Sequence, residues 1–181
     1  MHPLVASEWK YYLAWVRLRQ HDAYLLWMER AESEALWPDA TGRVPSFDNL
    51  EQLIKLTEAI GVRLEPQPPE LTNFDLVLTW LANPAKQVPV KACLDAWNLF
   101  DDLASGAGAA FIGRRRGPVR NRVYDKLYDG SGLWQISPTE ARQARQARHW
   151  RQEERRTLHR VLRQGFRLWQ KYVYPVSNAA A

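Results

Sequence analysis

Residues 137–173 read SPTEARQARQARHWRQEERRTLHRVLRQGFRLWQKYV. The stretch opens with Ser137, Pro138 and Glu140 at the N-cap, first and third positions of a predicted helix. A serine N-cap accepts a hydrogen bond from the third helical N–H, and a glutamate at that third position reaches back to the cap. Proline suits the first position, where its missing N–H has no helical partner to lose. Together these signals predict a helix that begins at Ser137.

The C-terminal half of this stretch carries two residue series with helical spacing. Apolar or small residues recur at three- and four-residue steps, and cationic residues follow the same rhythm about 200° away around the helix. The first series is Leu158, Leu162, Gly165, Trp169 and Tyr172, and the second is Arg156, Arg160, Arg163, Arg167 and Lys171. This pattern predicts a helix with one face in the core and a cationic face opposite.

The N-terminal half, residues 141–150, interleaves alanines with Arg142, Arg145 and Arg148 and offers a core little apolar area. A continuous helix over the whole stretch would be about 54 Å long at 1.5 Å per residue. A compact domain of this chain length is only roughly 40 Å across. We therefore expect the long helix to bend or break near residue 150.

The composition predicts a single cytoplasmic domain. The chain has 181 residues, nine tryptophans and one cysteine. This length suffices for a sizeable core, and the aromatic content argues against disorder. Cys93 alone forms neither an intrachain disulfide nor a cysteine-rich zinc site, which fits a reducing compartment. We expect neither a signal peptide nor a membrane partner, because the start lacks a charged-then-apolar pattern and no apolar run nears about 18 residues.

Charge is divided unevenly along the chain. Residues 1–110 hold nine Lys/Arg and fifteen Asp/Glu, a net −6, whereas residues 111–181 hold sixteen and five, a net +11. Such asymmetry suggests a polyanionic partner for the basic part. The alternative is that the acidic part neutralises the basic part within the fold. The sequence leaves both interpretations open.

The remaining segments are interpreted as further helices. The predicted ranges are 9–36, either continuous or kinked near 20–22, 47–57 capped by Ser46, 74–81 capped by Thr72 or Asn73, 90–103 after Pro89, and 119–128. Strand signals are scarce. The expected fold class is therefore all-α: an irregular single-domain bundle of about six to eight helices over residues 1–176, with a flexible tail at 177–181.

A loop with three consecutive arginines is the sharpest chemical feature. Glycines 113 and 117 flank it, and arginine forks bind phosphates through two parallel hydrogen bonds. Together with arginines of the last helix, this loop is predicted to follow a nucleic-acid backbone. The predicted binding residues are Arg114, Arg115, Arg116, Arg120, Arg122, Arg142, Arg145, Arg148, Arg156, Arg160, Arg163 and Arg167.

No catalytic residue, metal site or cofactor site is predicted. Residues 106–111 resemble a dinucleotide fingerprint, but Phe111 replaces the third glycine. Asp101 and Asp102 point about 100° apart on a helix, so the pair is poorly placed to chelate a metal ion. The preferred interpretation of Asp95, Asp101 and Asp102 is helix capping or salt bridging to arginines. The histidines do not pair at ligand spacing, and no serine stands in a nucleophile elbow.

The leading hypothesis is a non-enzymatic helical binding module that contacts nucleic-acid backbone, such as an accessory subunit of a nucleoprotein complex. The second is a protein–protein module, an adaptor or an inhibitor of an acidic partner, with arginines and tryptophans as anchors. The third is an enzyme whose site forms only in three dimensions. A continuous cationic face would favour the nucleic-acid-binding module. Arginines paired to the acidic half would favour the protein–protein module, and a pocket with converging carboxylates would favour the enzyme.

Overall fold

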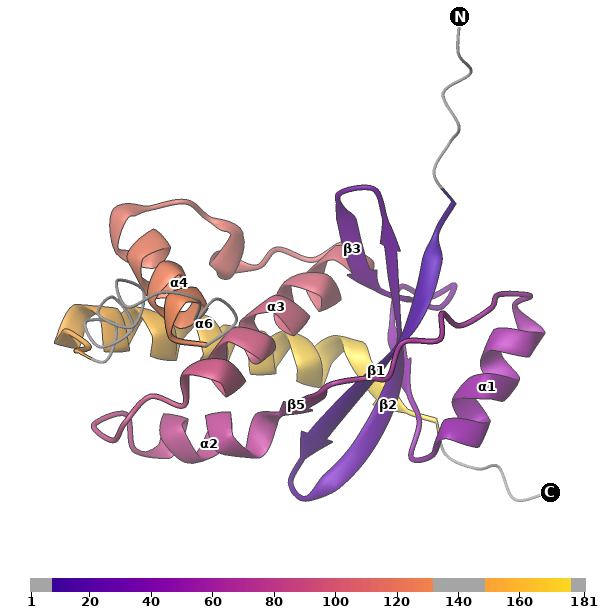
Figure 1. Cartoon of the computed structure of the whole chain (residues 1–181), viewed down its shortest axis with the longest axis horizontal. Helices are drawn as coiled ribbons and strands as arrows, with labels where there is room; N and C mark the ends of the chain where they lie inside the picture. Colours follow the sequence, from indigo (N-terminus) through magenta and orange to yellow (C-terminus); the bar gives the residue numbers. More distant parts are fainter. Residues whose placement is uncertain (1–7, 132–148, 177–181) are drawn as a thin grey trace, which may run out of the picture.

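The computed structural model describes residues 8–131 and 149–176 and shows a mixed α/β fold (Figure 1). The strands are β1 (Lys10–Leu18), β2 (His21–Arg30), β3 (Ser33–Leu36), β4 (Val44–Ser46), β5 (Leu71–Asn73) and β6 (Val173–Pro175). The helices are α1 (Leu50–Ala59), α2 (Phe74–Ala82), α3 (Val90–Gly106), α4 (Pro118–Gly130) and α6 (Gln152–Tyr172), with a 3-10 turn η1 (Ile112–Arg114). The all-α prediction is therefore wrong.

The error lies in residues 9–36, which form strands instead of a helix. β1 and β2 pair antiparallel from Lys10 opposite Glu29 to Leu18 opposite His21. β3 extends this hairpin on one side and β5 pairs parallel to β1 on the other, giving the strand order β3-β2-β1-β5. A second, two-stranded sheet joins β4 to β6 in parallel near the chain's C-terminus.

The turn between β1 and β2 consists of Arg19 and Gln20, whose φ angles are +54° and +64°. Positive φ at both central residues is the geometry of a hairpin turn in which Asn-Gly is the usual sequence. Here the carboxylate of Asp75, in the first turn of α2, accepts hydrogen bonds from both backbone N–H groups. A contact from a distant helix thus supports this turn, and its local sequence carries no turn signal.

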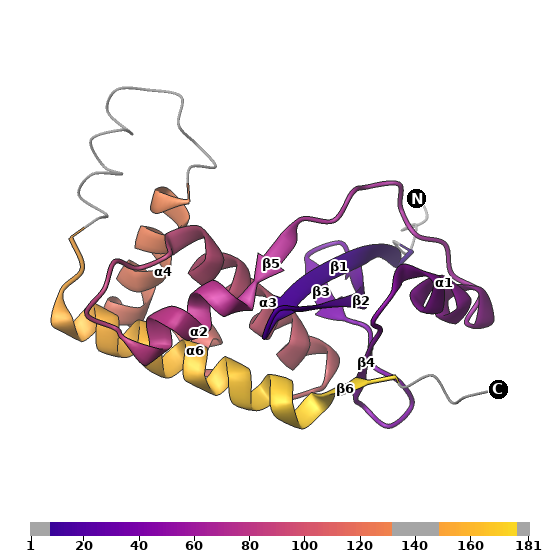
Figure 2. The same cartoon turned by 90° about the horizontal axis from the view of Figure 1, so that it is seen from below.

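The sheet is covered on both faces. Figures 1 and 2 show α1 on one side of it and α2, α3, α4 and α6 on the other. As a result, most residues of β1 and β2 are at least partly buried, and neither strand shows a strict alternation of buried and exposed residues. Strands enclosed in this way lack the period-two pattern that marks a half-exposed strand.

α3 and α6 pack closely at one crossing point. Gly165 of α6 lies against the ring of Phe100 of α3, and a Cβ at position 165 would overlap that ring. Phe74, Phe166 and Trp169 surround the same point, with ring centroids of Phe74 and Phe100 5.0 Å apart. The apolar face predicted for α6 is confirmed, because Leu158, Leu162, Gly165 and Trp169 are buried.

The other helix predictions are largely confirmed. α2 begins after Asn73, whose side chain accepts from two backbone N–H groups of its first turn. α3 and α4 also fall where the sequence places them. α1 differs at its start: Asn49 is the N-cap, and Ser46 lies in β4. No described helix, in 8–131 or 149–176, has both the length and the apolar composition of a membrane span.

No helix runs continuously through residue 150, because residues 149–151 are not helical and α6 begins at Gln152. Its first turn is closed by Glu154, which accepts from the backbone N–H of Arg151 at 2.9 Å. Lys126 of α4 donates to the same carboxylate at 2.6 Å. The predicted helix start at Ser137 lies outside the described residues.

Candidate functional site

One face of α6 presents a line of cations. Arg156, Arg160, Arg163, Arg167 and Lys171, which we call the cationic face of α6, are all exposed. At 1.5 Å per residue the line is about 22 Å long. None of the five forms an ion pair within 8–131 and 149–176. In the described residues, the acidic N-terminal part of the chain therefore does not neutralise these five cations through ion pairs.

The arginine loop differs, because its first arginine, Arg114, is hydrogen-bonded to other residues of the protein. Arg114 donates to the carboxylate and the carbonyl of Asp101 and to the hydroxyl of Ser105. Arg115 and Arg116 are exposed and form no ion pair in the described part of the chain. This outcome also confirms the predicted salt bridge between α3 carboxylates and arginines, in the case of Asp101.

The two arginines that follow the loop are also partly engaged. Arg120 donates to the carbonyl of Arg115, and the Nε of Arg122 lies 3.9 Å from Glu154. Arg114, Arg115, Arg116 and Arg120 line a cavity of about 450 Å³ together with Asp101 and Asp125. The loop arginines thus share their surroundings with carboxylates, unlike the cationic face of α6. Arg142, Arg145 and Arg148 lie outside the described residues.

The loop arginines and the cationic face of α6 lie on different elements, and Gln164 of α6 joins the two regions by accepting from the N–H of Ile112 and donating to the carbonyl of Ala110. On α3, Asn98 is about 160° around the helix from Phe100, which packs against α6. Asn98 lines the cavity of the loop arginines, so that cavity opens on the side of α3 away from α6. On α6, Arg163 and Arg167 are about 160–200° from Gly165 and point away from α3.

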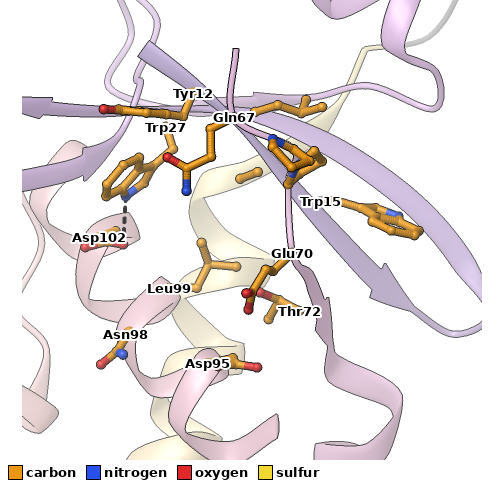
Figure 3. A pocket seen from close by; sticks show the side chains of 14 residues that line it. Tyr12, Trp15, Trp27, Gln67, Glu70, Thr72, Asp95, Asn98, Leu99 and Asp102 are labelled. Carbon is orange, nitrogen blue, oxygen red and sulfur yellow. Dashed lines mark hydrogen bonds between the residues drawn. The ribbon is translucent and has the colours of Figure 1, made fainter. Parts of the chain in front are cut away.

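A second cavity, of about 250 Å³, lies between α3, the hairpin β1–β2 and the segment that leads into β5. Figure 3 shows Trp27 descending from the sheet toward Asp102 of α3, with Gln67, Glu70 and Thr72 on the facing side. The indole Nε1 of Trp27 donates to Asp102 at 2.9 Å. The other acidic members are Asp95 and Glu70, which share Lys91 at 3.0 Å and 3.3 Å.

Burial raises the pKa of Asp102 to about 7, against the smaller opposing effect of the hydrogen bond from Trp27. Burial also raises the pKa of Asp95, with Lys91 acting in the opposite sense. The sequence prediction placed these residues only in caps or salt bridges and missed the cavity. A signal was available, because Asp95, Asn98 and Asp102 form a polar stripe at steps of three and four along an otherwise buried helix. In the described part of the chain, no three His, Cys, Asp or Glu side chains could hold a metal ion.

The raised pKa of Asp102 makes a prediction about stability. Between pH values of about 4 and 7, the folded protein keeps a proton that the unfolded chain has lost, so the free energy of unfolding falls as pH rises. We expect Asp102→Asn, which stays neutral and can still accept from Trp27, to raise the free energy of unfolding at pH 8 by about 1–3 kcal/mol. The gain should shrink at pH 5. Urea unfolding at both pH values measures this.

Asp48→Asn is the matched control for that prediction, because Asp48 is exposed and its substitution removes the same charge. It should leave stability within about 0.5 kcal/mol at either pH. Two results would contradict the assignment of a neutral, desolvated carboxyl: an Asp102→Asn protein that is no more stable than the original at pH 8, or a gain in the free energy of unfolding that is as large at pH 5 as at pH 8.

Comparisons with known proteins identify a structural likeness. No family model and no curated protein sequence matches the chain. Among solved structures, the chain is similar to the crystal structure of the SatS C-terminal domain in complex with bromine, with a TM-score of 0.53 and 10% sequence identity. The match covers 92% of this chain and 94% of that one. At this identity the likeness concerns the fold alone, and it spans both the sheet and the helices.

Proposed function

We propose that this protein is a non-enzymatic binding module that contacts the backbone of a nucleic acid through the cationic face of α6. The observation that carries the proposal is the line of five exposed cations that have no ion pair among the described residues. Arg114, by contrast, is already bonded to Asp101 and Ser105. The proposal implies a location where nucleic acid is available, such as the cytoplasm.

The spacing of these cations fits a phosphate backbone. B-DNA carries one phosphate per about 3.4 Å of axis on each strand, so a line of about 22 Å faces roughly six base pairs. Arginine supplies most of the line, and its planar fork binds phosphate oxygens through two parallel hydrogen bonds. Contacts of this kind give affinity with little sequence preference.

The line is also unfavourable for the isolated helix, which supports a role in binding. Like charges four residues apart, such as Arg156 and Arg160 or Arg163 and Arg167, destabilise a helix by about 0.2–0.5 kcal/mol per pair. The only carboxylates on described α6 are Glu153, exposed at its first turn, and Glu154, which is buried. A polyanion would replace this mutual repulsion with attraction.

Fluorescence anisotropy with labelled duplex DNA, single-stranded DNA and RNA tests the proposal over a range of salt concentrations. The variant replaces four arginines of the face by glutamine: Arg156→Gln, Arg160→Gln, Arg163→Gln and Arg167→Gln. On duplex DNA, we expect its slope of log affinity against log salt to be less steep by about 3–4, with at least tenfold weaker binding at low salt.

The control variant removes the same charge from exposed arginines elsewhere, with the changes Arg19→Gln, Arg63→Gln, Arg115→Gln and Arg116→Gln. It should keep most of the original slope, because none of these residues lies on α6. Equal losses in the two variants would mean that net charge alone drives binding. Retained slope in the α6 variant would reject the proposed face.

A further inference from the structure

The cavity beside Asp102 is lined by side chains that specific contacts hold in place. The ring of Trp27 is held from two directions, by the hydrogen bond to Asp102 and by the ring of Tyr12 at a centroid distance of 5.1 Å. Tyr12 is itself fixed by a hydrogen bond to Glu29 at 2.9 Å. The indole and the carboxylate therefore occupy defined positions at the edge of the cavity (Figure 3).

The charges around this cavity do not balance. Lys91 lies between Glu70 and Asp95, and Arg114 is bonded to Asp101. Asp102 forms no ion pair with any lysine or arginine of the described chain, and its hydrogen bond comes from a neutral indole. A desolvated carboxylate without a cation is costly for a folded protein. A cationic ligand would supply the missing partner.

The dimensions and the lining limit what the ligand is. At about 250 Å³ the cavity is below the range of roughly 300–1,000 Å³ that holds drug-sized molecules, so it suits one side chain or a small organic ion. Its lining offers acceptors from several directions, namely Asp102, Asn98, Gln67, Glu70 and Thr72. Histidine, cysteine and serine are absent from this described lining, which favours binding over nucleophilic chemistry.

We propose that this cavity binds a guanidinium group, which pairs with the carboxylate of Asp102 and lies against the indole of Trp27. A planar guanidinium has five N–H donors and stacks on aromatic rings, so it uses the acceptors and the ring together. The group would come from a free guanidino compound or from an arginine side chain of a protein partner. This site is on the side of α3 away from the cationic face of α6, and it does not depend on nucleic-acid binding.

The experiment measures binding at pH 8 by isothermal titration and by tryptophan fluorescence. One arm compares butylguanidinium with butylurea, which has the same shape without the charge. The other arm compares a peptide, acetyl-Gly-Arg-Gly-amide, with the peptide in which citrulline replaces arginine. We expect the charged member of at least one pair to bind at least tenfold more tightly. The pair with the tighter charged member identifies the source.

Asp102→Asn should weaken this binding at least tenfold, since it keeps the shape and removes the charge. That variant is expected to be the more stable protein at pH 8, so a loss of binding would not reflect unfolding. Asp48→Asn, which removes an exposed charge outside the cavity, should bind normally. Absence of binding by both charged probes at millimolar concentration, equal binding of the neutral probes, or unchanged binding by Asp102→Asn would each overturn the proposal.

The pH dependence of binding provides a separate readout. Asp102 faces Trp27 of β2, Glu34 of β3, Asp101 of α3 and Arg114 of η1, with Glu70, Lys91 and Asp95 around the same cavity. Because the carboxyl loses its proton near pH 7, affinity for a guanidinium should rise between pH 6 and pH 8. In Asp102→Asn this rise should disappear. A rise of the same size in that variant would assign the effect to another group.

Discussion

Replacing Phe100 by alanine is expected to lower the free energy of unfolding by about 3–5 kcal/mol. The side chain is fully buried at the crossing of α3 and α6, where it contacts Gly165 and has its ring centroid 5.0–5.1 Å from those of Phe74 and Phe166. Its removal leaves a cavity between elements that are fixed on all sides, so collapse around the site would be incomplete. Unfolding in guanidinium chloride, followed by tryptophan fluorescence, measures the loss.

The contact with Gly165 makes this prediction specific. Gly165→Ala places a methyl group in the space of the Phe100 ring and should also destabilise the protein, by about 1–3 kcal/mol. In the double variant, the new methyl group enters the cavity that the lost ring leaves. The two changes together should then be less harmful than their sum by about 1 kcal/mol or more. Strict additivity would show that the two helices do not meet as the structure places them.

Replacing Lys126 by methionine is the second large expected effect, a loss of about 3–5 kcal/mol. Glu154 is 1% exposed, and Lys126 is its close cationic partner at 2.6 Å. Burial raises the pKa of Glu154, but hydrogen bonds from Lys126 and the backbone of Arg151 outweigh it and hold the pKa below its usual value. Without the lysine, the buried carboxylate keeps the backbone N–H of Arg151, but its remaining ion-pair partner in the described chain is the more distant Arg122, 3.9 Å away.

The sign of the pH effect separates this prediction from loss of packing. In the unaltered protein, the stability that Glu154 contributes is present above pH about 4.5 and is lost as pH falls through its lowered pKa. In Lys126→Met the carboxyl should protonate readily, so the deficit relative to the unaltered protein should shrink on going from pH 7 to pH 4. Denaturant unfolding at both pH values checks this.

Lys55→Met is the matched control, because Lys55 pairs with Glu51 on the exposed face of α1, where the two side chains are 69% and 77% exposed. Its loss should change stability by no more than about 0.5 kcal/mol. A similar small effect for Lys126→Met would mean that Glu154 is not buried as the structure shows.

The parts of the fold that the sequence predicted correctly have strong local signals. α2 has its cap at Asn73, α3 follows Pro89, and α6 has an apolar stripe of three- and four-residue steps. These signals act within one or two turns of a helix, so tertiary structure is not needed to read them. The same reasoning placed the cations of α6 on its exposed face.

The strands escaped prediction because their signals come from the tertiary structure. Trp9, Leu13 and Val16 happen to recur at helical steps, while enclosure of the sheet on both faces removes the alternation of a typical strand. The turn at Arg19 and Gln20 lacks glycine and asparagine, and it relies on Asp75 from another element. A sequence pattern cannot register that contact.

The candidate sites follow the same division. The pairing of Arg114 with Asp101 depends on how the loop after α3 folds back, and it engages one predicted contact residue in an internal ion pair. The cavity at Asp102 needs Trp27 from β2, Glu70 from the segment before β5 and two carboxylates of α3 to meet. Only the polar stripe on α3 was visible in the sequence.

Arginine footprinting tests the central claim most directly. The protein is modified with phenylglyoxal, alone and with saturating duplex DNA, and the modification of each arginine is measured by mass spectrometry. We predict protection of Arg156, Arg160, Arg163 and Arg167, with little change at Arg115 and Arg116 of the loop. Protection confined to Arg115 and Arg116, or to none of these residues, would contradict the assignment of the nucleic-acid surface to α6.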